Sequence, residues 1–92
     1  MESGTYIKMG QELVPVSPST GYWVAVQPAL PSQIVEGQYL GVWTDEKDGK
    51  QYYDRSVFVA DLVDALIVAK QFDQIAIWDN SKRTEIYVDY SV

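Results

Sequence analysis

The segment DLVDALIVAKQFDQIAIWD, residues 61–79, contains the pattern that decides the fold. Asp61 is a typical N-cap, and Asp64 three residues later resembles a capping box and favours the positive end of a helix dipole. Apolar residues follow at helical spacing: Leu62, Ala65, Leu66, Ala69 and Phe72. Residues 74–79 are too short and too β-branched for a second helix, and their unbroken apolar run is typical of an interior strand. The segment predicts a helix over 62–72 and then a strand over 74–79.

The predicted helix is apolar over more than one face. Val63, Ile67 and Val68 widen its apolar surface beyond a single stripe. We therefore expect the helix to pack on a sheet and to contact something else at its flank.

The strand that follows the helix places residues alternately on two faces. We expect Ile75 and Ile77 under the helix, with Ala76 and Trp78 on the opposite face. The Trp78 ring then stays exposed unless the N-terminal residues or a second molecule cover it.

The rest of the chain reads mainly as antiparallel strands. Residues 22–27 form the first clear strand, and residues 39–45 and 50–59 form a hairpin whose turn contains Asp48-Gly49. A tight turn there places Trp43 near Tyr52 across the hairpin. Residues 84–90 alternate, with Ile86 and Val88 inward. The predicted class is α+β: a mostly antiparallel sheet in the order β-β-β-α-β-β, with one helix packed on one face.

A chain of 92 residues predicts a single domain, residues 1–92. Its first twenty residues read as an irregular N-terminal arm, because glycine and proline interrupt every period, and residues 21–92 form the sheet-plus-helix core. Within the arm, TYIKM (5–9) and ELVPV (12–16) are alternatively short edge strands, where proline is tolerated.

The composition excludes several classes of function. The net charge of −6 disfavours direct binding of nucleic acid or of an anionic membrane, but permits a basic protein partner. The chain has no cysteine and no histidine, which removes thiolate zinc sites and the usual neutral-pH proton shuttle. No apolar run approaches the roughly 20 residues that span a bilayer, so we expect a cytoplasmic protein.

No catalytic, metal or cofactor site is predicted. The densest acidic cluster, Asp45, Glu46, Asp48 and Asp54, does not have the spacing of a calcium loop and reads as the solvated tip of a hairpin. The serines have no histidine to activate them, and no glycine-rich phosphate loop precedes a helix. We therefore predict that the protein is not an enzyme.

Aromatic side chains are the more informative group. One helix can cover only one face of a sheet, so aromatic residues on both faces imply an exposed aromatic surface or its burial by a partner. The alternatives are that several of these rings cap the core, or that they stack on a carbohydrate or nucleobase. The residues on predicted strands are Trp23, Trp43, Trp78, Tyr52, Tyr53, Tyr87 and Tyr90.

From Tyr39 onward the sequence resembles small proteins and domains encoded by phages and other mobile elements, some of them parts of large polyvalent phage proteins. The motifs that carry the resemblance are G-x-W-x-D, Y-x-D-x-S, two helical alanines and Q-x-A-I-W-D, and GYWVAV (21–26) also fits. Here they are Gly41, Trp43 and Asp45; Tyr52, Asp54 and Ser56; Ala65 and Ala69; and Gln74, Ala76, Ile77, Trp78 and Asp79. The resemblance implies an accessory protein of a virus or mobile element, a class in which inhibitors of host defence are common.

The leading hypothesis is a non-enzymatic protein-binding module, most concretely an acidic phage-type inhibitor of a host defence protein such as a CRISPR effector. Its partner presents a basic surface. Asp45, Glu46, Asp48 and Asp54 are expected to steer association, and Trp43, Tyr52, Tyr53 and Tyr87 to make the contact.

Two alternatives stay open. The first is a sponge for a small ligand or nucleotide signal, with a phosphate held by Arg55, Lys82 or Arg83. The second is a structural homodimer that pairs through strand aromatics or an open sheet edge.

Overall fold

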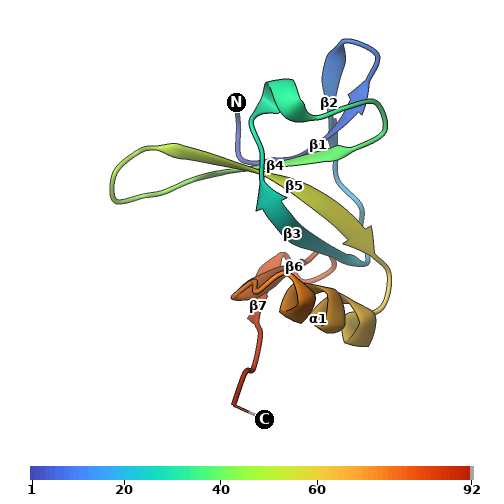
Figure 1. Ribbon diagram of the computed structural model, residues 1–92, viewed down its shortest axis with the longest axis vertical. Coiled ribbons are helices and arrows are strands. Elements are labelled where there is room, and N and C mark those ends of the chain that lie inside the picture. Colours follow the sequence, from blue (N-terminus) through green and yellow to red (C-terminus); the bar gives the residue numbers. More distant parts are fainter. Residues whose placement is uncertain (92) are drawn as a thin grey trace. The chain divides into compact units, whose positions relative to one another are not determined.

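The computed structural model describes residues 1–91, which form seven strands, one α-helix and a short 3-10 turn (Figure 1). Every described strand pairing is antiparallel, so the predicted α+β class is confirmed. The strands are β1 Gly4–Met9, β2 Glu12–Val16, β3 Tyr22–Pro28, β4 Tyr39–Thr44, β5 Gln51–Val59, β6 Ala76–Asp79 and β7 Thr84–Tyr87; the helix α1 is Leu62–Gln71 and the 3-10 turn is Pro31–Gln33.

The chain divides into two compact units. Unit 1 consists of Met1–Ser17 and Gln27–Ser56. Unit 2 consists of Pro18–Val26 and the described residues from Val57 onward. Strands β3 and β5 each contribute residues to both units.

Unit 1 is built from strands without an α-helix among its described residues. β1 pairs with β2 and with β4, and β4 pairs with β5. The core contains Leu40 and Val42 from β4, together with Ala29 and Ile34 from the connection between β3 and β4. Side chains of that connection therefore take the place that a helix takes in a two-layer fold.

The first residues of unit 1 form a hairpin. The edge-strand interpretation of ELVPV agrees with β2, whose Pro15 pairs with Tyr6. TYIKM lies in β1, which is flanked by β2 and β4 and is therefore an interior strand of unit 1. Gly10, with φ of +62°, turns the chain between the two strands.

Unit 2 contains α1, packed on β6, and the pairings β3–β6 and β6–β7. The Asp61 carboxylate accepts a hydrogen bond from the Asp64 amide at 3.2 Å, so the predicted N-cap is confirmed. The core consists of Val24, Ala65, Ala69 and Ile77, and Ile86 and Val88 pack against it from the inward face that alternation predicts.

The strand after the helix is shorter than predicted. β6 begins at Ala76, and Ile75 lies in the bend before it with 75% of its surface exposed, so the expectation that Ile75 lies under the helix is wrong. Asp73 adopts a left-handed conformation, φ +53°, and the Gln74 amide bonds to the Ala69 carbonyl at 2.9 Å. This helix end places Ile75 outside the layer that Ile77, only 2% exposed, enters.

Candidate binding surface

The β4–β5 hairpin of unit 1 displays an exposed aromatic pair. Trp43 and Tyr52 are direct cross-strand partners, and their rings stack at 4.6 Å between centroids with 20° between planes. The side chains are 50% and 40% exposed. The predicted proximity of Trp43 and Tyr52 is confirmed.

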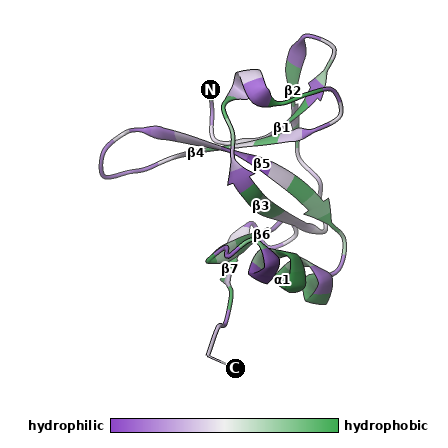
Figure 2. Ribbon diagram, viewed as in Figure 1, coloured by the Kyte–Doolittle hydropathy of each residue, from purple (hydrophilic) through white to green (hydrophobic). Residues whose placement is uncertain are grey.

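The turn of this hairpin holds two carboxylates in place. Asp45 accepts a hydrogen bond from the Lys47 amide at 2.7 Å, and Asp48 accepts one from the Lys50 amide at 2.9 Å. Gly49, with φ of +70°, supplies the left-handed residue that closes the four-residue loop. Figure 2 shows the tip of the hairpin as hydrophilic. Carboxylates therefore lie at the end of the hairpin that carries the rings.

Tyr52 is tied to this turn. Its hydroxyl donates to Asp48 Oδ2 at 3.2 Å. This hydrogen bond is the largest cause of a raised Tyr52 pKa; the negative charge of Asp48, a little desolvation and the charge of Asp45 add to it. The hydrogen bond to Asp48 also restrains the orientation of the Tyr52 ring. Together the two rings, Asp45, Glu46 and Asp48 form what we call the hairpin patch.

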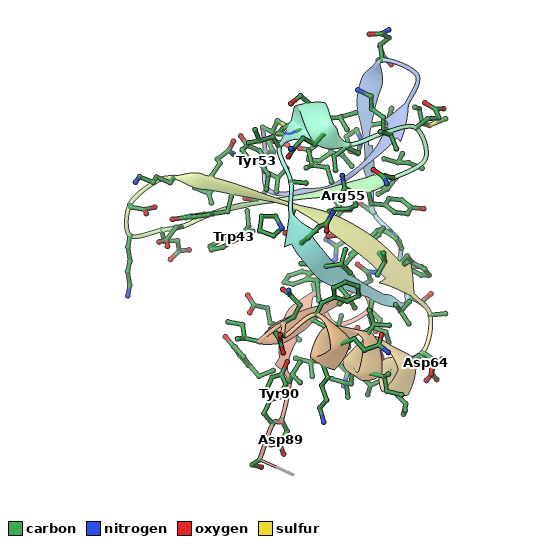
Figure 3. All side chains as sticks on the ribbon, in the orientation of Figure 1. Trp43, Tyr53, Arg55, Asp64, Asp89 and Tyr90 are labelled. Atoms are coloured by element: carbon green, nitrogen blue, oxygen red, sulfur yellow. The ribbon has the colours of Figure 1, made fainter. Side chains whose placement is uncertain are left out.

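Tyr53 lies on the other face of the hairpin. Its side chain is half-buried and packs against the core of unit 1 with Leu40 and Val42. Its hydroxyl donates to Gln51 Oε1 at 3.0 Å. Figure 3 labels Tyr53 and Trp43 on opposite sides of the strands. The structure therefore separates Tyr53 from the hairpin patch.

Asp54 shares a face with Trp43 and Tyr52 but is held inside unit 1. The Ser56 hydroxyl donates to Asp54 Oδ1 at 2.5 Å, and the side chain lies over Gly41. Burial raises the pKa of Asp54, and the hydrogen bond from Ser56 opposes part of that rise. Strand alternation predicts which face Asp54 lies on, but only the packing over Gly41 shows that its carboxylate is half-buried.

Tyr87 belongs to unit 2, where it ends β7 and is well exposed. The candidate cations of the ligand hypothesis are also divided. Arg55 of unit 1 donates to Gln38 Oε1 at 3.1 Å and to the Gln33 carbonyl at 3.0 Å, whereas Lys82 and Arg83 lie in the β6–β7 turn of unit 2.

A depression of about 300 Å³ beside Tyr52 was not predicted. It lies within unit 1 where the chain leaves β3, and the Ala29 amide bonds to the Tyr53 carbonyl there at 3.3 Å. No sequence signal distinguishes this PALP segment from an ordinary loop. Its lining residues are Pro28, Ala29, Leu30, Gln33, Gln51, Tyr52 and Tyr53. Leu30, which is 58% exposed, and Tyr52 thus both border this depression.

Over residues 1–91, no group of three or more His, Cys, Asp or Glu side chains is arranged to hold a metal ion. In the same residues, no helix has both the length and the apolar character needed to cross a membrane.

No family model matches the chain, and comparison with curated proteins and with solved structures finds no match. The resemblance to phage-encoded proteins stays a prediction.

Proposed function

We propose that this chain is a non-enzymatic protein-binding module that docks its hairpin patch on a basic protein surface. The observation that carries the proposal is the Trp43–Tyr52 stack, which is exposed and lies beside the carboxylates of a hydrogen-bonded turn.

The aromatic part of the argument concerns affinity. Trp and Tyr are the side chains that most often dominate binding energy, because they remove a large area from water when a partner covers them. Here the Tyr52 ring is restrained by its stack on Trp43 and by its hydrogen bond to Asp48. Restraint before binding reduces the entropy that is lost on association. The pair therefore has the properties of a preorganised anchor.

The electrostatic part concerns the partner. The chain carries −6, and the tip alone has three carboxylates against Lys47 and Lys50. The tip therefore has a net charge of only −1. Most of the electrostatic attraction to a partner comes from the charge of the whole chain, and the tip determines how the chain is oriented as it approaches. A negative domain associates faster with a positively charged groove, and the effect falls with ionic strength. Asp54 is not assigned to the tip contact, because its carboxylate is bonded to Ser56 and is half-buried.

The biological setting we propose follows from the phage resemblance. The protein acts in the cytoplasm of a host cell as an inhibitor of a defence protein, and a CRISPR effector fits because its nucleic-acid channel is basic. Covering such a channel needs no catalytic group.

The first experiment compares Trp43→Ala with Trp78→Ala as immobilised baits in an extract of the natural host. Trp78 is a matched control because it is also a partly exposed strand tryptophan, in unit 2. We expect a basic protein captured by the unmodified chain and by Trp78→Ala to be lost with Trp43→Ala. With that protein purified, Trp43→Ala should speed dissociation by about thirtyfold or more. Equal capture by both variants would refute the hairpin patch as the contact.

The second experiment compares Glu46→Lys with Glu12→Lys, which change the net charge equally at two exposed positions of unit 1. We expect Glu46→Lys to slow association about two- to fivefold more than Glu12→Lys, with little change in dissociation. Association that is independent of salt concentration would remove the electrostatic part of the proposal.

A further inference from the structure

β7 is an edge strand of unit 2, since it pairs with β6 alone among the strands of residues 1–91. The Val88 amide, directly after β7, bonds to the Ile75 carbonyl in the same register at 2.9 Å. Hydrogen-bonded and non-hydrogen-bonded pairs alternate along an antiparallel ladder. Ile86 therefore directs its main-chain groups toward β6. Glu85 and Tyr87 direct theirs to the outer side of β7.

The outer side of β7 is free to pair. Over residues 1–91, no main-chain group bonds to the outward amides and carbonyls of Glu85 and Tyr87, and both side chains are exposed. Edge strands usually prevent pairing with another chain by means of proline, lysine or a bulge. The segment TEIYVDY, residues 84–90, contains no proline, lysine or glycine, and its only charges are Glu85 and Asp89. The edge can therefore accept another strand, provided that its two acids meet no acid there.

We propose that β7 pairs antiparallel with β7 of a second copy of the chain, about a two-fold axis at Ile86. Such an axis relates position 85 of one copy to position 87 of the other, because both lie one residue from the centre. Glu85 and Tyr87 of the second copy then exchange both main-chain bonds, and the same pair repeats on the other side of the axis. The two Ile86 residues form a non-hydrogen-bonded pair, in which side chains are closest. Ile86 already packs against the core of unit 2, so this pair extends the core across the contact.

The acids of β7 select this register. A two-fold axis must match outward-directed residues with each other, so it lies at a residue and not between two residues. An axis at Glu85 would place the two Glu85 side chains opposite each other, and an axis at Tyr87 would place Glu85 opposite Asp89. Like charges in directly opposite positions are destabilising. The axis at Ile86 avoids both contacts.

The turns that flank β7 limit the register as well. Arg83, directly before β7, has a left-handed conformation with φ of +52°, and after the strand the Ser91 amide bonds to Asp89 Oδ1 at 2.9 Å. An axis displaced by two residues in either direction would place β7 against one of these turns. Only the axis at Ile86 opposes the whole of β7 with itself.

The order of charges favours a second copy over an unrelated protein. Counted from the axis, Glu85 and Tyr87 lie one residue to either side, and Arg83 and Asp89 lie three residues to either side. The two-fold axis therefore pairs acid with phenol next to the centre, and base with acid at each end. A surface for a foreign partner has no reason to be complementary to itself, whereas an isologous contact requires it.

The contact is small, and so the dimer is weak. A four-residue strand offers less area than the roughly 1,200 Å² of a stable interface, and each copy carries −6. We expect a dissociation constant of about 10–100 μM, so that the mean mass depends on concentration.

The first test measures molecular mass by sedimentation equilibrium across a dilution series. We expect a value approaching twice the 10.4 kDa monomer at the highest concentration. Tyr87→Pro removes the outward N–H, which the ladder with β6 does not use, and Tyr87→Ala is the matched control that keeps it. We expect Tyr87→Pro to raise the dissociation constant about tenfold more than Tyr87→Ala, and hydrogen exchange of the Val88 amide checks that β7 stays on β6. A monomer at every concentration, or equal dissociation constants for the two variants, would overturn the proposal.

The second test uses cysteine, which the chain lacks. Ile86→Cys places the two thiols on the axis, at a Cα separation of about 4.5 Å that a disulfide can bridge. Thr84→Cys lies on the same face of the strand, but the axis separates its two copies by about 14 Å. With oxidised glutathione, Ile86→Cys should form a disulfide-linked dimer at least about tenfold faster, although Thr84 is the more exposed position. Equal rates, or faster linkage of Thr84→Cys, would contradict the register.

The third test uses charge reversal at the two ends of the contact. Arg83→Glu alone and Asp89→Arg alone each place like charges at both symmetric positions, and each should weaken self-association about three- to tenfold. An equimolar mixture of the two variants restores both attractive pairs and should associate about as well as the unmodified chain. A mixture that associates no better than its components would contradict the pairing of Arg83 with Asp89. All three tests are independent of the hairpin patch, which lies in unit 1.

Discussion

The two units of this chain cover their strands in different ways, and what remains exposed differs accordingly. In unit 1 loop residues Ala29 and Ile34 cover one side of β4, and the stacked Trp43–Tyr52 pair lies on the other face of the hairpin. In unit 2 a helix covers β6 with two buried alanines, and of its larger aliphatic residues Val63 and Ile67 face outward. Leu66 and Val68 pack partly against the same core, and Val63 and Ile67 are left without cover. The manner of covering thus determines which kind of surface each unit offers.

The largest expected effect tests whether the two units unfold together, as the short chain length predicts. Leu40→Ala removes a fully buried side chain of unit 1 and should lower the free energy of unfolding by about 2–5 kcal/mol. In a urea titration followed by NMR, the Val42 and Ala69 amides should lose their native signals at one common, lowered midpoint. Loss of the Val42 signal alone would show that unit 1 unfolds independently of unit 2.

A second comparison uses two glycines with the same backbone conformation, one in each unit. Gly21 has φ of +80° and Gly37 has φ of +82°, but a Cβ on Gly21 would lie 2.3 Å from the Phe58 ring, whereas nothing lies within 4 Å of a Cβ on Gly37. Gly37→Ala should lower the free energy of unfolding by about 1 kcal/mol, because alanine is strained at this positive φ. Gly21→Ala should lower it by about 2–3 kcal/mol, because Phe58 must also leave its edge-to-face contact with Trp23. Equal unfolding midpoints for the two variants would contradict the contact between Phe58 and Gly21.

The third comparison contrasts two aspartates whose pKa values move in opposite directions. The Ser81 hydroxyl is the main cause that lowers the pKa of Asp79. A lowered pKa in the folded state stabilises the protein above the unfolded pKa, about 4, and this contribution is lost as pH falls through the folded pKa. Burial raises the pKa of Asp54, so its contribution is present below about pH 4 and is lost as pH rises through the folded pKa.

At pH 7, therefore, Asp79→Asn should lower the free energy of unfolding, and Asp54→Asn should leave it unchanged or raise it. We expect the difference in unfolding free energy between each variant and the unmodified chain to become smaller as the pH falls from about 7 to about 3. Urea unfolding across this pH range measures both differences. If both substitutions lower the free energy of unfolding at pH 7, or both raise it, one of the two assigned aspartate environments is incorrect.

The smallest effect concerns the two adjacent tyrosines of β5. Tyr52→Phe removes the exposed hydrogen bond to Asp48, and Tyr53→Phe removes the half-buried one to Gln51. We expect the free energy of unfolding to fall by roughly 0.5 kcal/mol or less in Tyr52→Phe and by about 1 kcal/mol in Tyr53→Phe. Ultraviolet titration tests the Asp48 contact more directly, because it measures the pKa of the tyrosines. Asp48→Asn should lower the pKa of Tyr52 toward that of an ordinary phenol. An unchanged Tyr52 titration would rule out the Asp48 contact.

Much of the fold follows from short-range patterns. The Asp61 cap, the helix that starts at Leu62 and the opposition of Trp43 and Tyr52 depend on neighbours in sequence or across one turn, so spacing alone predicts them. Strand alternation also predicts that Tyr52 and Tyr53 point to opposite faces of the hairpin. Our prediction of the contact residues included both tyrosines and did not use this alternation.

Other features depend on contacts between distant residues. The sequence predicts that Asp54 is a solvent-exposed acid. The structure shows that it packs over Gly41 and accepts a hydrogen bond from Ser56. The depression beside Leu30 exists because the chain leaves β3 at Ala29, and nothing in the PALP segment indicates what lies next to it. The location of Tyr87 in unit 2 is likewise a property of the whole chain.

The sequence by itself determined which side chains share a face, because the periods of helix and strand are properties of the backbone. Only the tertiary structure decided which of those faces are covered. Ile77 is buried and Ile75 is exposed, although both were expected under the helix. The reason is physical: periodicity relates residues along one element, whereas burial depends on what another element brings against it.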